Sequence, residues 1–287
     1  MAYLNDEQLD FWHEQGYLRI PAVFTPEEVS QLRDDLDWMI DNWAGRGLGW
    51  TGPWRKKYMD DATEAKSELI AMHDLHFYAQ SWMRCVTNAK LCQAMGEMLE
   101  GAAELHHSTM HVKPPETGQP FPMHQDWAFY KHEDNRYVDV LVHLDDTCHE
   151  NGEIRFLAGS HKQGARDHIT SFVNDQGETE TCTPHLSTDD YKLEDTVPVP
   201  AKVGDVVCFN IFTIHGSHIN QTDEMRRMVR VGYKHPANPQ IDGQSSGRPG
   251  LIVAGRRPRQ ENQPLFDTSG PAQSEQQEDA KKFGVKL

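Results

Sequence analysis

Positive charge is scarce in this chain. Its 287 residues carry 28 lysines and arginines against 44 aspartates and glutamates, which gives a formal net charge of -16 at pH 7. Proteins that bind nucleic acid need cations to neutralise the backbone phosphates, and cations also draw proteins to anionic membranes. The sequence therefore argues against both kinds of partner, and its acidity favours solubility.

Cysteines and long hydrophobic runs are also few. The five cysteines are scattered and lack the CxxC spacing of a zinc ribbon, and their odd number does not suit a disulfide framework. The charged start of the chain, MAYLNDEQLDFW, has no apolar stretch like that of a signal peptide. No run approaches the length of a membrane-spanning helix. We therefore expect a cytoplasmic protein.

The first hundred residues carry helix signals. Asn5 is a capping residue for one helix, and Thr25 with Glu28 forms the capping box of the clearest helix in the chain. Residues 74–99 predict two further helices with a break near Thr87. This part of the chain is therefore expected to be helical.

Residues 46–61 predict an irregular loop, because RGLGWTGPWRKKYMDD contains glycines and a proline that interrupt regular structure. Its two tryptophans and its run of three cations are unusual for a loop in an acidic protein. Two interpretations stay open. The segment is either a lid over a substrate site or a connection whose tryptophans pack on the core.

From about residue 104 the pattern changes to short β-rich runs such as YVDVLVHLDD, EIRFLAG and DVVCFNIF, separated by turn signals. Asn151-Gly152 is a hairpin signal between two of these runs. Many short strands at this spacing are typical of a sandwich or a barrel. Helices followed by strands indicate the α+β class.

The pattern fits one domain over residues 1–266. We expect its helical part at about 1–103 and its β-core at about 104–236. The polar residues 267–287 cannot bury enough surface to order themselves, so they predict a flexible tail.

Three residues form a candidate metal-binding set. His124 and Asp126 lie two apart in PMHQDWAFY, so both side chains point to one face if the stretch is extended. His215 follows the apolar run 206–212 and is expected at the end of a buried strand. Two histidines and one carboxylate are the ligand set that holds a non-haem Fe(II) and leaves coordination positions open. His124, Asp126 and His215 are therefore the predicted metal ligands and catalytic residues.

A cation follows the second histidine. Arg226 lies eleven residues after His215, and a guanidinium binds a carboxylate through two hydrogen bonds. This favours a co-substrate with its own carboxylate, such as a 2-oxo acid, which would fill two open positions and leave the third for O2. Ser217 can add a hydroxyl donor on the same face.

Together these stretches resemble the phytanoyl-CoA dioxygenase family, which includes ectoine hydroxylases. The matching stretches are HQD at 124–126, ENG at 150–152, AGSH at 158–161, KVGDVVCF at 202–209, and HGSxxNxT at 215–222 followed by Arg226. The resemblance implies a double-stranded β-helix (jelly-roll or cupin-like) core with flanking helices. It also implies Fe(II) as metal and 2-oxoglutarate as co-substrate.

By position, the resemblance assigns His124, Asp126 and His215 to the metal. It assigns Arg226 and Ser217 to the distal carboxylate of 2-oxoglutarate, with Gln125 as a further contact. Related halogenases carry a small residue in place of the carboxylate ligand, so the presence of Asp126 favours hydroxylation.

Candidate substrate residues are less specific. Trp127, Phe129 and Tyr130 follow the metal pair directly, and they either shape a substrate cavity or pack in the core. Arg155 and Lys113 either bind an anionic group of the substrate or face solvent. The cations hint at an anionic small molecule. The sequence does not identify that molecule or the oligomeric state.

These observations predict an Fe(II)- and 2-oxoglutarate-dependent dioxygenase. It would hydroxylate or otherwise oxidise a small molecule while 2-oxoglutarate and O2 are converted to succinate and CO2. Two alternatives stay open: a non-catalytic metal-binding or sensing protein of the same fold, and a cupin-like metal enzyme that uses no oxo acid.

Overall fold

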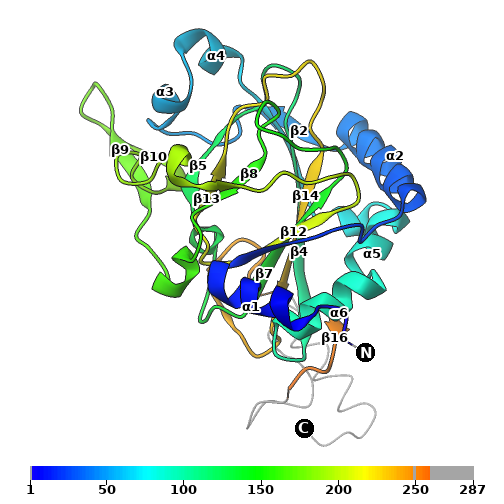
Figure 1. Cartoon of the computed structure of the whole chain (residues 1–287). Coiled ribbons are helices and arrows are strands. Elements are labelled where there is room, and N and C mark those ends of the chain that lie inside the picture. The colour runs from blue at the N-terminus through cyan, green and yellow to red at the C-terminus, as the bar shows by residue number, and fades with distance from the viewer. Residues whose placement is uncertain (1, 248–249, 259–287) are drawn as a thin grey trace, which may run out of the picture.

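The computed structural model describes residues 2–247 and 250–258, and it shows two antiparallel sheets facing each other with helices packed on the outer side of the larger one (Figure 1). The predicted α+β class with a jelly-roll core is confirmed. The predicted tail, 267–287, lies outside the described residues.

The large sheet has eight strands. Its order is β1 (Tyr17–Ile20), β12 (Val206–Asn210), β7 (Tyr137–His143), β14 (Met228–Lys234), β4 (Ala103–Val112), β3 (Leu69–His73) and β2 (Gly45–Gly47), with β16 (Leu251–Ala254) also beside β4. All residues of β7 and β12 are buried. Central strands of a sheet that is covered on both faces are buried along their whole length in this way.

The small sheet carries the functional strands. Its order is β11 (Val197–Pro198), β8 (Ile154–Phe156), β13 (His215–Ser217) and β5 (Phe121–His124). Apolar side chains from both sheets fill the space between them, among them Leu141, Phe156, Phe209 and Met228.

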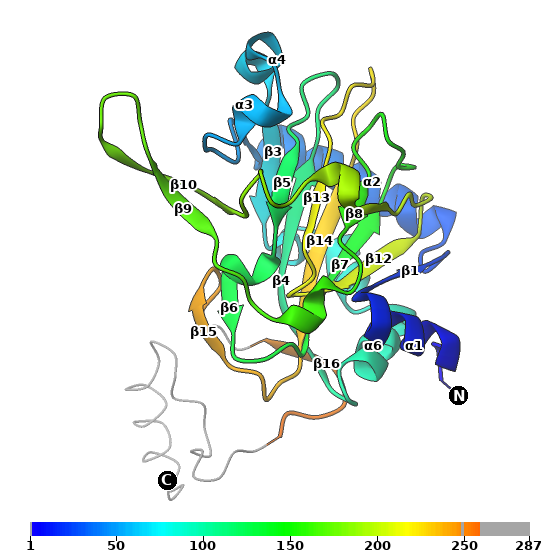
Figure 2. The same ribbon diagram turned by 60° about the vertical axis from the view of Figure 1, so that its left-hand side comes forward.

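Four helices cover the other face of the large sheet (Figures 1 and 2). They are α1 (Asp6–Gln15), α2 (Pro26–Asn42), α5 (Gln80–Val86) and α6 (Ala89–Met98). Leu36 and Met39 of α2 and Trp82 of α5 are fully buried in one cluster with the sheet residues Val140 and Val231. This cluster is the main core, and the helices leave the space between the two sheets for the site.

The helix ends agree with the sequence predictions. Asn5 and Thr25 each form a capping box, the first with Gln8 and the second with Glu28. The break near Thr87 separates α5 from α6, whose first turn is capped by Asn88.

The helical description of residues 1–103 was incomplete. The short strands β1, β2 and β3 lie between the helices and join the large sheet. Their few residues are recognised as strands only through partners far along the chain, for example β1 with β12. The Asn151-Gly152 hairpin was wrong, because β7 and β8 flank this turn but belong to different sheets.

The remaining elements lie outside the two main sheets and the four covering helices. The segment predicted as a loop contains α3 (Arg55–Tyr58) and is followed by α4 (Asp61–Lys66). β9 (Ile169–Val173) and β10 (Thr179–His185) form a projecting hairpin, and β6 (Tyr130–His132) pairs with β15 (Gln240–Gly243) (Figure 2). The short 3-10 helices are η1 (Leu75–Phe77), η2 (Asp126–Ala128), η3 (Ser160–Gln163) and η4 (Leu193–Asp195). Among the described residues, no helix combines the length and apolarity needed to cross a membrane.

Thr25→Ala tests the capping box of α2. The variant loses the hydroxyl that accepts from the Glu28 amide, so the free energy of unfolding should fall by about 1 kcal/mol in urea denaturation. Thr25→Ser keeps the acceptor and should match the parent protein. Equal stability of the alanine variant would contradict the assignment.

Candidate active site

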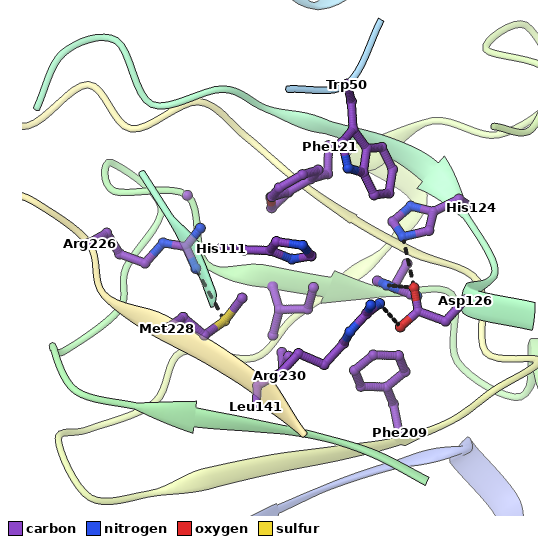
Figure 3. Close-up of a pocket in the computed structure, with 14 residues that line it drawn as sticks. Trp50, His111, Phe121, His124, Asp126, Leu141, Phe209, Arg226, Met228 and Arg230 are labelled. Carbon is purple, nitrogen blue, oxygen red and sulfur yellow. Dashed lines mark hydrogen bonds and ion pairs between the residues drawn. The ribbon is translucent and has the colours of Figure 1, made fainter. Parts of the chain in front are cut away.

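The three predicted metal ligands converge in the structure. The Nε2 atom of His124 lies 3.4 Å from Oδ1 of Asp126, and the Nε2 atom of His215 lies 3.8 Å from the same oxygen. One ligand atom from each residue lies within 4.8 Å of the others, and all three residues are buried. Figure 3 shows His124 and Asp126 at one end of the cavity.

Local strand pairing explains this convergence. β13 pairs antiparallel with β5, and His215 is the direct partner of His124. The chain leaves β5 through the extended residue Gln125 and turns at η2, so Asp126 reaches the same point.

Backbone carbonyls set the histidine tautomers. Nδ1 of His124 donates to the carbonyl of Pro122 at 2.7 Å, and Nδ1 of His215 donates to that of Thr213 at 3.0 Å. Each Nε2 atom therefore keeps its lone pair for a metal. Burial, together with the neighbouring His124, lowers the pKa of His215 to about 3, so this ligand is neutral at pH 7.

Asp126 completes a donor set that fits Fe(II). Its Oδ1 atom is buried without a hydrogen-bond partner and faces the two Nε2 atoms. Burial alone would raise the pKa of Asp126, but the guanidinium of Arg230 and the two histidines hold it well below its usual range. The result is a carboxylate and two imidazoles around one point, which is the non-haem iron set.

A cavity extends from the ligand trio to Arg226, which lies at the opposite end in Figure 3. Arg226 is only 2% exposed, and its Nε and Nη2 atoms have no hydrogen-bond partner. Burial lowers the pKa of Arg226 to about 10, so it stays charged at pH 7. A buried guanidinium with open donors fits a carboxylate.

Lys113 lies beside this end of the cavity. Its Nζ atom donates to Oγ of Ser217 at 2.8 Å and to the carbonyl of His218, and its backbone pairs with that of Arg226. A side chain at Gly152 would place its Cβ 2.8 Å from this Nζ atom, so glycine leaves room for the lysine. Burial, together with Arg226, lowers the pKa of Lys113 well below its usual value.

Comparison with known proteins shows the family to which the chain belongs. A model of the phytanoyl-CoA dioxygenase (PhyH) family matches residues 12–228. The chain belongs to this family. The predicted enzyme class, a non-haem Fe(II)- and 2-oxoglutarate-dependent dioxygenase, is confirmed with it.

Individual relatives share most of the chain. It is 29% identical to a probable alpha-ketoglutarate-dependent hypophosphite dioxygenase of Stutzerimonas stutzeri, over 79% of this chain and 77% of that protein. It is 25% identical to a methylphosphonate hydroxylase of Gimesia maris, over 80% of each chain. The crystal structure of EctD from S. alaskensis with 2-oxoglutarate and 5-hydroxyectoine superposes with a TM-score of 0.64 at 20% identity, covering 92% of this chain and 90% of that one. This last likeness shows the fold.

Gln125 does not face the cavity, contrary to the expectation. Its side-chain amide donates to the carbonyls of Gly164 and Phe212 and accepts from the amide of Arg166. The residue between two ligands on an extended segment points to the opposite face. Gln125 therefore ties down the loop after η3.

The aromatic residues after the ligand pair pack in the protein and do not line the cavity. Phe129 lies nearest to it, with its ring 5.8 Å from that of His124. The Trp127 indole packs on Phe212 and donates to a backbone carbonyl, and Tyr130 is buried with its hydroxyl on Asp139.

Arg155 is likewise directed away from the cavity. Its guanidinium pairs with Glu153 at 3.1 Å and donates to Thr196 and to the carbonyl of Leu193. These contacts fasten η4 to β8, so the predicted binding of an anionic substrate by Arg155 is not supported by its position.

Sequence reasoning missed three residues that line the cavity: Trp50, His111 and Arg230. The Trp50 ring lies 4.6 Å from that of His124 and 4.8 Å from those of Phe121 and Phe129. Two tryptophans in an irregular segment were the available signal for Trp50. Alternation along β4 and β14 could have pointed to His111 and Arg230.

Gln125→Ala tests the corrected role of this residue. Losing three buried hydrogen bonds should lower the free energy of unfolding by about 1–3 kcal/mol, measured in urea. Binding of 2-oxoglutarate by the iron-loaded protein, measured by anaerobic titration, should stay unchanged. Weakened binding at unchanged stability would restore Gln125 as a co-substrate contact.

Proposed function

We propose that this enzyme oxidises a small anionic molecule, with Fe(II) held by His124, Asp126 and His215 and 2-oxoglutarate anchored by Arg226. One observation carries the proposal. A buried, charged guanidinium with open donors shares a cavity with three converging metal-ligand atoms. A co-substrate with a carboxylate at each end connects the two.

The proposed anchor for the distal carboxylate has two donors. Arg226 offers its Nε and Nη2 atoms, which have no other partner. Ser217 offers its hydroxyl hydrogen, because its Oγ atom already accepts from Nζ of Lys113. Lys113 thus orients Ser217 at the same end.

Apolar side chains form part of the cavity wall. Leu141, Ile154, Phe209 and Met228 line it and are buried. Charges interact more strongly beside such a wall than in bulk water, so the anchor holds the co-substrate in one orientation. When bound, Fe(II) and 2-oxoglutarate supply the activation of O2, which consumes the oxo acid and yields succinate and CO2.

The shared cavity supports a small substrate, because the same space also has to hold the co-substrate. Trp50 closes one side, and Gln119 fixes its backbone by accepting from the Trp50 amide at 3.1 Å and donating to its carbonyl at 2.6 Å. Arg55 donates to the same carbonyl at 3.0 Å. The tryptophan is thus held as a roof.

The chemistry of the cavity supports an oxyanion. His111 is neutral, since burial and Arg230 lower its pKa well below its usual value, so its ring offers one N–H donor and one acceptor. Relatives named for hypophosphite and methylphosphonate act on small phosphorus oxyanions. We therefore propose a phosphinate, a phosphonate or a carboxylate of few carbon atoms as substrate.

Arg226→Ala tests the function directly. The variant should weaken 2-oxoglutarate binding by about 2–5 kcal/mol, the cost of truncating one partner of a buried charge pair. Binding is measured by anaerobic titration of the Fe(II)-loaded protein, and succinate formation should fall in parallel. Arg227→Ala is the matched control, because that guanidinium pairs with Asp37 and Asp145 outside the cavity.

The outcomes separate the rival functions. Metal binding without 2-oxoglutarate binding in the parent protein would favour a metal-binding protein that does no catalysis. Turnover that survives Arg226→Ala would favour a metal enzyme that uses no oxo acid. Either result overturns the proposal.

Trp50→Ala tests the size limit. Removing the indole should admit bulkier anions, so succinate formation with larger phosphonates should rise relative to that with hypophosphite and methylphosphonate. Product formation is followed by phosphorus NMR. Trp43→Ala, at a side chain that is 57% exposed, is the control. An unchanged preference between small and large phosphonates would show that Trp50 does not limit the size of the substrate.

A further inference from the structure

Arg230 contacts the proposed metal ligand Asp126 on the carboxylate oxygen that does not face the histidines. It extends from β14 and donates through Nη1 to Oδ2 of Asp126 at 2.6 Å, which leaves Oδ1 facing the histidines. Figure 3 shows this contact on the side of Asp126 opposite His124. The two oxygens of one carboxylate therefore have different surroundings.

Several groups hold the guanidinium of Arg230 in place. It lies over the ring of Tyr130, 5.2 Å from the ring centre, and its Nη2 atom is 3.4 Å from Nε2 of His107. Its Nε atom lies 3.7 Å from Oδ1 of Asp139, whose other oxygen accepts from the Tyr130 hydroxyl at 2.8 Å. Arg230 is only 6% exposed, so these partners define its position.

We propose that Arg230 is a positioning residue that restricts Asp126 to metal ligation through Oδ1 alone. The proposal rests on the metal site of the proposed function. A carboxylate can bind a metal through one oxygen or through both. If Asp126 used both, it would take a position that the co-substrate or O2 needs. A strong hydrogen bond on Oδ2 prevents this, as groups behind metal ligands do elsewhere.

Arg226 and Arg230 differ in their carboxylate partners, and this difference supports a positioning role for Arg230. The two arginines lie four residues apart, and both are buried in the same cavity wall. Arg226 has no carboxylate partner among the described residues, whereas Arg230 contacts Asp126 and Asp139. Arg226 is therefore available to bind an anionic ligand, whereas Arg230 forms an ion pair with a carboxylate of the protein.

Arg230→Met tests the proposal with Mn(II) as the bound metal. The thioether keeps much of the side-chain volume and removes the donors, so Oδ2 of Asp126 becomes free to bind. The Mn(II)-loaded variant should show one exchangeable water fewer than the parent protein by water-proton relaxation. Its affinity for 2-oxoglutarate should fall by about tenfold, which is the lower end of the loss in metal affinity or activity when hydrogen-bond partners of metal ligands are removed.

Arg226→Met is the matched control. It removes the other buried arginine, so the water count on Mn(II) should stay at the parent value while 2-oxoglutarate binding is lost. Arg230→Lys restores a charged donor and should recover part of the parent behaviour. Tyr130→Phe removes only the hydroxyl that anchors Asp139, and it should shift both readouts in the direction of Arg230→Met by a smaller amount.

Two failures are distinguishable. A parent protein that binds no Mn(II) would overturn the metal site itself. A parent protein that binds Mn(II), with a folded Arg230→Met variant of equal water count and equal 2-oxoglutarate affinity, would overturn the role of Arg230. Should that variant not fold, a Tyr130→Phe variant with the parent water count and the parent 2-oxoglutarate affinity would overturn the role of Arg230.

Discussion

The antiparallel register of β13 against β5 is the constraint on which the site depends. It sets His215 directly opposite His124, and a slip of one residue would turn one strand's side chains to the other face. Each histidine also donates to the carbonyl two residues before it, so the strand backbone itself orients both rings. Metal ligands that are distant in the sequence thus need no dedicated scaffold beyond a pair of short strands.

The second requirement is a dry interior behind those strands. Helices cover the outer face of the large sheet, and the small sheet covers part of its inner face, so β14 is buried between β4 and β7. Arg230 lies on this strand and Arg226 lies just before it. A charge in such a place needs a partner. The fold therefore makes each buried charge near the cavity either part of an internal pair or a binding group for a ligand.

The sequence predicted the parts of the protein that are encoded locally. Helix caps such as Thr25 and the ligand motif with Arg226 depend on neighbouring residues, and the ligands do converge. Strands such as β1 and β2 were missed because a few residues acquire strand geometry only from distant partners. Gln125 and Arg155 were misjudged for a related reason. Their chemistry suits a ligand, but their donors are used by loops that only the tertiary structure brings near.

The arginines of this protein show that residue type alone does not assign a role. Arg55 is buried like Arg226, yet its donors go to Glu64, Ser67 and the backbone of the Trp50 segment, so it stabilises the roof. Arg230 donates to the carboxylate of Asp126 and lies beside His107. Arg226 alone of these three keeps two buried donors open and has no carboxylate beside it. Buried donors favour a ligand that can accept from them, and the proposed co-substrate would bring a carboxylate to these two. The position of Arg226 would therefore select for a ligand whose carboxylate reaches that far from the proposed metal site.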